Sequence, residues 1–234
     1  PTKVLLELGS NAALIVAEDA NLDAATAAVI RGGFYASGQA CISVQRVIVT
    51  APVAEVFIDK LSAAMGDVVA GDPRDPDIQV SALIDSRSTD RVRGWVEAAV
   101  DAGAREVLGA ETADRIARPT LLVDVPAGQS VWDEEIFGPV IAVRVVPDLE
   151  AAFEVANDTR YGLQSAIFTS SLATAFEALD RMEVGGLAVN EVPGFRSDVM
   201  PYGGIKDSGA GREGPRFAME EYTVTRMAII RPNP

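Results

Sequence analysis

Residues 19–50 read DANLDAATAAVIRGGFYASGQACISVQRVIVT, and this stretch decides the fold. Apolar residues of its first part recur at helical spacing up to the pair Gly32-Gly33, which predicts a helix over residues 19–35. Its last part, residues 44–50, alternates β-branched and polar residues and predicts a strand. Between the two, Gly38 opens a short loop that ends at Cys41. The sequence therefore predicts a helix, a loop with a cysteine, and a strand.

The same alternation continues along the chain. Helices are expected at residues 52–65, 88–102, 149–157 and 172–182, and strands at residues 4–8, 106–108, 120–125, 140–146, 164–169 and 187–189. Strands separated by helices of about ten residues imply right-handed crossovers. We therefore predict an α/β fold, a mostly parallel sheet flanked by helices, in one domain over residues 1–221. A long glycine-rich loop at 193–214 and a short helix precede a tail, residues 222–234, whose strand at 223–230 is a candidate for pairing outside the domain.

Composition excludes several classes of function. The 234 residues include 20 Lys+Arg and 34 Asp+Glu, a net charge of −14, and 48% are hydrophobic, enough for a substantial core. So acidic a chain argues against a nucleic-acid partner. No apolar run approaches the roughly 18 residues of a membrane span, and the N-terminal residues do not resemble a signal peptide. These observations predict a cytoplasmic protein with neither a nucleic-acid nor a membrane partner.

The histidine and cysteine counts narrow the chemistry. The sequence has no histidine, and Cys41 is its one cysteine. Ser-His-Asp triads, Cys-His dyads, His-rich zinc sites and intrachain disulfides are thereby excluded, and no metal site is expected. A lone cysteine is often a small buried hydrophobe. The glycine-opened loop favours catalysis instead, because backbone amides there can converge on an oxyanion, with carboxylates, amides or a cofactor as helpers.

Two carboxylates stand out, and one glycine motif does not. Glu7 lies in the apolar run 5–9, where an ionised group is costly unless it has a task. Glu135 belongs to an acid pair that leads into the aromatic turn at 136–139. Residues 209–214 fit G-x-G-x-x-G, but no strand is predicted before them and too little chain follows for a βαβ unit. We predict a tight surface loop there, not a phosphate site.

Several ordered motifs resemble the aldehyde dehydrogenase superfamily. They are LELG at 6–9, GQAC at 38–41 and EEIFGP at 134–139, followed by Asn157, YGL at 161–163, VN at 189–190, PYGG at 201–204 and the SG and GRE of 208–213. The spacing between Glu7 and Cys41 is also similar to that between the family's base and nucleophile. The resemblance implies the fold of the family's catalytic domain, with a C-terminal oligomerisation strand in the tail.

The resemblance also implies a mechanism. Cys41 would attack an aldehyde, and its own backbone amide would help to hold the oxyanion. The thiohemiacetal would pass hydride to the nicotinamide of NAD or NADP and leave a thioester. Glu7 would then activate the water that releases a carboxylic acid.

The resemblance assigns roles to further residues. Glu135 would bind the nicotinamide ribose and Phe137 would pack beside the nicotinamide ring. Glu213 resembles a second acid that assists proton movement near Glu7. Its alternative is a loop-anchoring ion pair with Arg212 or another base.

This sequence departs from the family pattern in three respects. Ser10 and Asn11 replace a glycine and a lysine, and Tyr202 replaces a phenylalanine; neither change is expected to touch a reacting group. Family members also carry an N-terminal half with the cofactor-binding domain and an oxyanion-hole asparagine. Residues 1–11 resemble the segment that leads out of that domain. We therefore expect the isolated chain to be weak or inactive, and the full-length enzyme to be a homo-oligomer.

The sequence leaves open both the aldehyde substrate and the choice between a dehydrogenase and two alternative functions. Arg196, in the loop at 192–200 that would border the aldehyde tunnel, is either a contact for an anionic substrate or a solvated arginine. Residues 9–11 and 41–43 are similar to the branch that acts on small hydroxylated or acidic aldehydes. One alternative is a truncated, non-catalytic assembly subunit whose last strand joins a partner's sheet. Another is a coenzyme A-acylating dehydrogenase, against which Glu7 argues.

Overall fold

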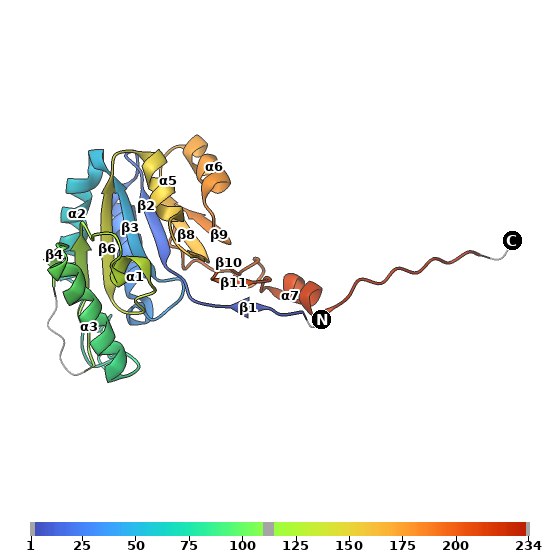
Figure 1. The fold of residues 1–234 in the computed structure, drawn as a ribbon, viewed down its shortest axis with the longest axis horizontal. Coiled ribbons are helices and arrows are strands. Elements are labelled where there is room, and N and C mark those ends of the chain that lie inside the picture. The colour runs from blue at the N-terminus through green and yellow to red at the C-terminus, as the bar shows by residue number, and fades with distance from the viewer. Residues whose placement is uncertain (1–2, 110–114, 233–234) are drawn as a thin grey trace.

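The computed structural model describes residues 3–109 and 115–232, and its centre is a mixed, mostly parallel sheet (Figure 1). Seven strands follow the order β4-β5-β6-β3-β2-β8-β9, and only the β4–β5 pair is antiparallel. The strands are β2 (Ala12–Val16), β3 (Val44–Thr50), β4 (Arg105–Leu108), β5 (Thr120–Val123), β6 (Val140–Val146), β8 (Gln164–Phe168) and β9 (Gly186–Val189). The prediction of an α/β fold with a mostly parallel sheet is confirmed.

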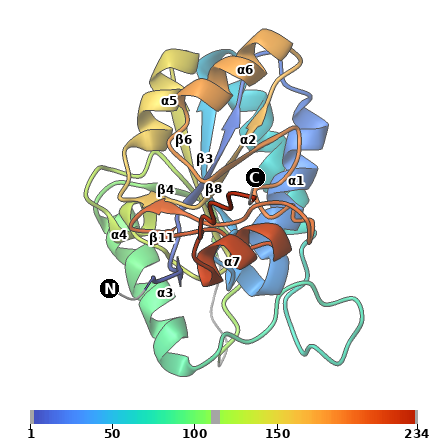
Figure 2. The same cartoon turned by 90° about the vertical axis from the view of Figure 1, so that its right-hand side faces the viewer.

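Helices cover both faces of the sheet (Figure 2). The apolar residues of α1 (Leu22–Phe34) and α2 (Ala51–Gly66) pack on one face. The other face is covered by α3 (Ser86–Asp101), α4 (Ser130–Asp133), α5 (Leu149–Asn157) and α6 (Leu172–Arg181). Side chains cap four of these helices by accepting a backbone N–H of the first turn: Asn21, Asp85, Asp148 and Ser171.

Strand β2 was not predicted, although it lies in the middle of the sheet between β3 and β8. All five of its residues are buried, with Leu14 packed on the α1–α2 side and Ile15 on the α5 side. A strand buried on both faces reads as a continuous apolar run and lacks the alternation that marks a half-exposed strand. The short run at 12–16 therefore gave no signal of period two.

The prediction of a buried strand at residues 4–8 was wrong. The strand here, β1 (Leu6–Glu7), has two residues, and Leu6 and Leu8 are 42% and 48% exposed. It pairs with β11 (Gly209–Ala210) outside the main sheet. The G-x-G-x-x-G run is therefore more than the tight surface loop that we predicted, because its first two residues form β11 and pair with β1. A second small pair joins β7 (Tyr161–Gly162) to β10 (Ile205–Lys206).

The predicted strand at 223–230 is not formed within this chain. After α7 (Pro215–Tyr222) the chain leaves the body of the molecule in an extended path, and its side chains are exposed (Figure 1). A strand needs a neighbour for its ladder, and the described part of the chain provides none here. The predicted boundary between 1–221 and the tail 222–234 stays a prediction, and residues 1–2 and 233–234 lie outside the described residues.

Strand β3 carries a buried arginine that ties the sheet to its surroundings. Arg46 is 1% exposed and donates to the main-chain oxygens of Asn11, Val155 and Ala156. Burial lowers the pKa of Arg46 to about 10, which keeps it charged at neutral pH. Two of its acceptors belong to the last turn of α5, where the helix dipole favours a cation.

No helix within residues 3–109 and 115–232 is long and apolar enough to cross a membrane. The cytoplasmic location stays a prediction.

The central position of β2 predicts a large effect of truncation there. Ile15→Ala should lower the free energy of unfolding by about 2–5 kcal/mol, because it leaves a cavity between the sheet and its helices. Ile84→Ala is the matched control, since Ile84 is 76% exposed. Urea titration of both variants measures the difference. Equal losses in the two would contradict the placement of β2.

Candidate active site

The loop that carries Cys41 is held in an uncommon backbone conformation. After α1, Ala36 and Ser37 have positive φ angles of 48° and 60°, and Gly38 has a φ of +76°. A Cβ on Gly38 would lie 2.2 Å from the carbonyl oxygen of Gly138, so this glycine lets two loops meet backbone to backbone. Cys41 follows, partly exposed, three residues before β3.

Strand β3 fixes the loop that contains Glu135. The buried Gln45 side chain donates to the Glu134 oxygen (2.5 Å) and accepts from the Ile136 amide (3.0 Å). Arg91 of α3 also donates to the Ile136 oxygen, at 2.6 Å. The residues before and after Glu135 are therefore both anchored to the body of the domain.

Glu135 lies against the backbone of residues 9–10. Its Oε1 accepts the Ser10 amide at 3.1 Å, and a Cβ on Gly9 would come within 2.7 Å of Oε2. Burial raises the pKa of Glu135, and the Ser10 N–H and the charge of Arg91 oppose that rise. Two residues on, Phe137 has a φ of +49° and an exposed ring. The structure thus places Glu135 beside the segment that leads from Glu7 into β2, and Phe137 at an exposed position two residues further along the loop.

Strand β1 positions Glu7 through a close backbone contact. Glu7 is paired with Gly209, whose φ is +146°. A Cβ at Gly209 would lie 2.2 Å from the Leu6 oxygen, so a larger residue would push β1 away. The glycine run at 209–214 therefore serves to place Glu7.

Glu7 carries a carboxylate oxygen that is shielded from solvent. Its Oε1 is buried and has no hydrogen-bond partner among the described residues. Burial raises the pKa of Glu7, and the negative charge of Glu213 raises it further, while Arg196 and Arg212 act in the opposite direction. A Cβ on Gly203 would lie 3.3 Å from Oε1, so this oxygen faces the turn at 202–204. Perturbed carboxylates of this kind cluster at functional sites.

Tyr202 lies close to both Cys41 and Glu7. Its side chain is 4% exposed, and its hydroxyl lies 3.4 Å from the Cys41 sulfur. Burial raises the pKa of Tyr202, and the neighbouring Cys41 and Glu7 add to the rise. Contrary to our expectation for this departure, the added hydroxyl contacts Cys41, the candidate reacting group. The substitution of phenylalanine by tyrosine was the one signal in the sequence, and it could not show where the added hydroxyl points.

Glu213 and Arg196 form an ion pair with each other. The Arg196 guanidinium also lies over the Tyr202 ring, 4.1 Å from its centre. Glu213 further exchanges two backbone hydrogen bonds with Tyr202, and Arg212 donates to main-chain oxygens instead of to Glu213. The anchoring partner of Glu213 is therefore Arg196. A part in proton movement stays a prediction.

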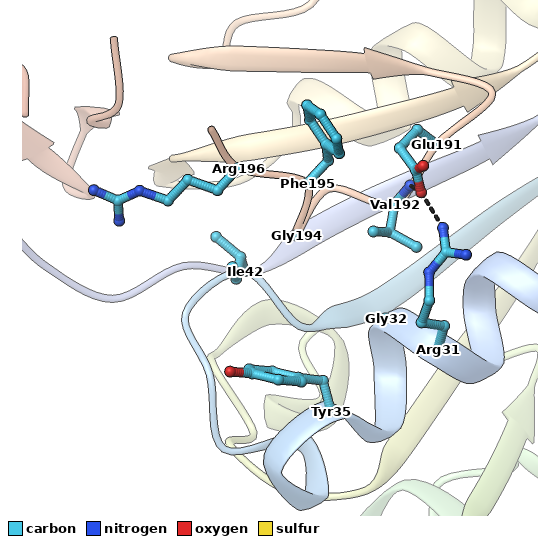
Figure 3. A pocket seen from close by; sticks show the side chains of 9 residues that line it. All are labelled: Arg31, Gly32, Tyr35, Ile42, Glu191, Val192, Gly194, Phe195 and Arg196. Atoms are coloured by element: carbon cyan, nitrogen blue, oxygen red, sulfur yellow. Dashed lines mark hydrogen bonds and ion pairs between the residues drawn. The ribbon is translucent and has the colours of Figure 1, made fainter. Parts of the chain in front are cut away.

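A pocket of about 590 Å³ opens next to this cluster (Figure 3). Tyr35, Ile42 and Phe195 give it apolar and aromatic walls, and Arg31 pairs with Glu191 at its side. Ile42, which lines the pocket, directly follows Cys41 in the sequence. Arg196 lines it too, but its guanidinium points away from Phe195 (Figure 3).

Comparisons with known proteins identify the family. The model described as "Aldehyde dehydrogenase family" matches residues 1–228, so the chain belongs to this family, as its motifs indicated. The chain is 39% identical to a 3-sulfolactaldehyde dehydrogenase of Priestia megaterium, over 97% of this chain and 48% of that protein.

Solved structures of the family have the same fold. Aldehyde dehydrogenase 21 of Physcomitrella patens, in complex with the reaction product succinate, has a TM-score of 0.90 at 39% identity, over 93% of this chain and 46% of that one. A glyceraldehyde-3-phosphate dehydrogenase of Methanocaldococcus jannaschii, complexed with NADP, has a TM-score of 0.89 at 37% identity, over 93% and 47%. The chain spans about half the length of the relatives it matches.

The anchoring of the Glu135 loop can be tested at Gln45. Gln45→Ala leaves the Glu134 oxygen and the Ile136 amide unpaired, which should lower the free energy of unfolding by about 2 kcal/mol. Hydrogen exchange at the Ile136 amide should also become faster. Gln129→Ala is the control, because no side-chain hydrogen bond of Gln129 is found in the described residues. Unchanged exchange at Ile136 would show that Gln45 does not hold this loop.

Proposed function

We propose that this chain is the catalytic part of an NAD- or NADP-dependent aldehyde dehydrogenase that oxidises a small aldehyde to a carboxylic acid. One observation carries the proposal. The single thiol, Cys41, contacts the Tyr202 hydroxyl, and beside the adjacent Gly203 lies a buried Glu7 oxygen that has no hydrogen-bond partner among the described residues. A nucleophile and a base with a raised pKa beside one turn are the groups that acyl transfer through a covalent intermediate requires.

The residues of this chain divide the reaction between them. The Cys41 thiolate adds to the aldehyde carbon, and the Cys41 amide donates to the oxyanion of the thiohemiacetal. The nicotinamide, when bound, accepts the hydride that leaves the thiohemiacetal. Glu7 then takes a proton from water, the hydroxide oxygen bonds to the thioester carbon, and the C–S bond breaks to release the acid and the thiolate. A raised pKa brings Glu7 closer to neutral pH and makes it a better base.

The residues present fit one end of the cofactor. Glu135 offers a carboxylate to a ribose diol, and Phe137 offers an exposed ring to the nicotinamide. The glycine run at 209–214 resembles a phosphate-binding loop, but its first two residues pair with β1 in close backbone contact. We therefore assign the rest of the dinucleotide to a domain outside this chain. The NADP complex of the Methanocaldococcus relative supports this class of cofactor.

The proposed substrate is a small hydroxylated or anionic aldehyde. The reported relatives are named for 3-sulfolactaldehyde and glyceraldehyde 3-phosphate, and one was solved with succinate. In this chain Arg31 and Arg196 line the pocket, and each is paired with a carboxylate. A substrate anion would bind Arg196 by taking the place of Glu213. Arg196 therefore remains our candidate substrate contact.

The exposed tail keeps an assembly role open. Val224, Met227, Ile229 and Ile230 are all more than 80% exposed on an extended segment. We propose that this segment pairs with another copy in a homo-oligomer. An assembly subunit without activity is the alternative function, and the reactivity of Cys41 distinguishes the two.

Ester hydrolysis tests the chemistry without the cofactor. With p-nitrophenyl acetate, Cys41→Ala should abolish turnover. Glu7→Gln should still release one equivalent of nitrophenol but hydrolyse the acyl-enzyme about 10²–10⁴-fold more slowly, because the general base is lost. Mass spectrometry of the intact chain should show the acetyl group trapped on Glu7→Gln. Turnover of Glu7→Gln at the rate of the unmodified chain would rule out Glu7 as the base.

The pH dependence of this hydrolysis tests the role of Glu213. The reaction needs ionised Glu7, so its rate rises with pH through the raised pKa of Glu7. Glu213→Gln removes a negative neighbour, lowers the pKa of Glu7, and should move the acidic limb down by less than about one pH unit, since solvent screens both groups. Glu220→Gln, on exposed α7, is the control. An upward shift would contradict the assigned charge coupling.

A further inference from the structure

We propose that the Tyr202 hydroxyl donates a hydrogen bond to the Cys41 sulfur and so stabilises the thiolate, the form in which this sulfur acts as a nucleophile. This inference rests on the proposed function in that it takes Cys41 as the nucleophile. It adds a further catalytic residue, one that touches the reacting sulfur itself.

The geometry suits a donated hydrogen bond. The oxygen–sulfur distance is 3.4 Å, and in the part of the chain that the structure describes the sulfur is the one partner found for this hydroxyl. The Tyr202 side chain is buried, and a hydrogen bond to an ion is stronger where water is excluded. Burial raises the pKa of Tyr202, so the phenol stays protonated and acts as the donor in its hydrogen bond with the sulfur.

The Tyr202 ring is fixed by contacts that do not involve its hydroxyl. Its backbone exchanges two hydrogen bonds with Glu213, at 2.6 and 3.2 Å. The Arg196 guanidinium covers the ring, and Arg196 is itself paired with Glu213. A phenylalanine at this position would keep every one of these contacts. The hydroxyl is therefore the part of Tyr202 that the packing does not require.

The surrounding charges explain why such a donor is useful. Glu7 faces the same turn, and an ionised carboxylate disfavours a second negative charge nearby. The chain has no histidine that could form an ion pair with the thiolate. The Arg196 guanidinium is already paired with Glu213, and it lies over the ring of Tyr202. A neutral donor stabilises the thiolate without neutralising the base that the later hydrolysis step needs.

Alkylation of the one cysteine tests the proposal directly. The rate of reaction of this chain with iodoacetamide, followed against pH, reports the thiolate of Cys41 alone. Tyr202→Phe should react about three- to tenfold more slowly near neutral pH, because it loses a hydrogen bond to a charged group, and the greater nucleophilicity of the more basic thiolate offsets about half of that loss on a logarithmic scale. This deficit should disappear at high pH, where both thiols are ionised. Tyr222→Phe, at an exposed tyrosine, should match the unmodified chain.

A pH–rate curve of Tyr202→Phe that overlays that of the unmodified chain overturns the proposal. The thiolate absorbance in the far ultraviolet, measured against Cys41→Ser, provides a second titration, and circular dichroism verifies that each variant is folded. Neither measurement uses an aldehyde or a cofactor. Failure of this inference is therefore distinguishable from failure of the proposed dehydrogenase activity.

Discussion

The parallel alignment of four neighbouring strands is the constraint on which the site depends. β2, β3, β6 and β8 begin at the same edge of the sheet, with Ala12 level with Val44 and Arg46 level with Ala142. The segments just before these starts carry Glu7, Cys41, Glu135 and Tyr161. Residues far apart in the sequence therefore converge because their strands are in register. Ligands of open α/β sheets commonly bind at the carboxyl ends of strands, whereas this cluster lies at the amino ends.

Strand β3 follows the loop of Cys41 and also holds neighbouring segments in place through its side chains. Gln45 and Arg46, adjacent on this strand, hold two different parts of the surroundings: Gln45 binds the loop of Glu135, and Arg46 binds the main chain at Asn11 and the end of α5. Both side chains are buried, and both satisfy main-chain groups that would otherwise be unpaired. The strand thus fixes the candidate nucleophile Cys41, the loop of Glu135 and the entry to β2 relative to one another, as the proposed active site requires.

Much of the fold was accessible from local patterns, and the failures have physical causes. The strand at 140–146 and the helix at 149–157 were predicted with the bounds they have, because alternation and helical periodicity are strong there. β2 was missed because burial on both faces removes alternation, and residues 223–230 have strand composition but no neighbour. The motifs led to the family and to the candidate residues. The contact between Tyr202 and Cys41 joins residues 161 positions apart, which no local pattern can reveal.

Cys41 is the one cysteine of this sequence, and this affects how its sulfur responds to oxidation. Cys41 is partly exposed, and the thiolate of an accessible cysteine is the form that peroxide converts to a sulfenic acid. Proteins with a second, resolving cysteine capture that state as an internal disulfide, which reductants readily reverse. This chain has no second sulfhydryl to do so. Within this chain, a sulfenic acid at Cys41 is therefore open to a small thiol from solution but not to an internal disulfide.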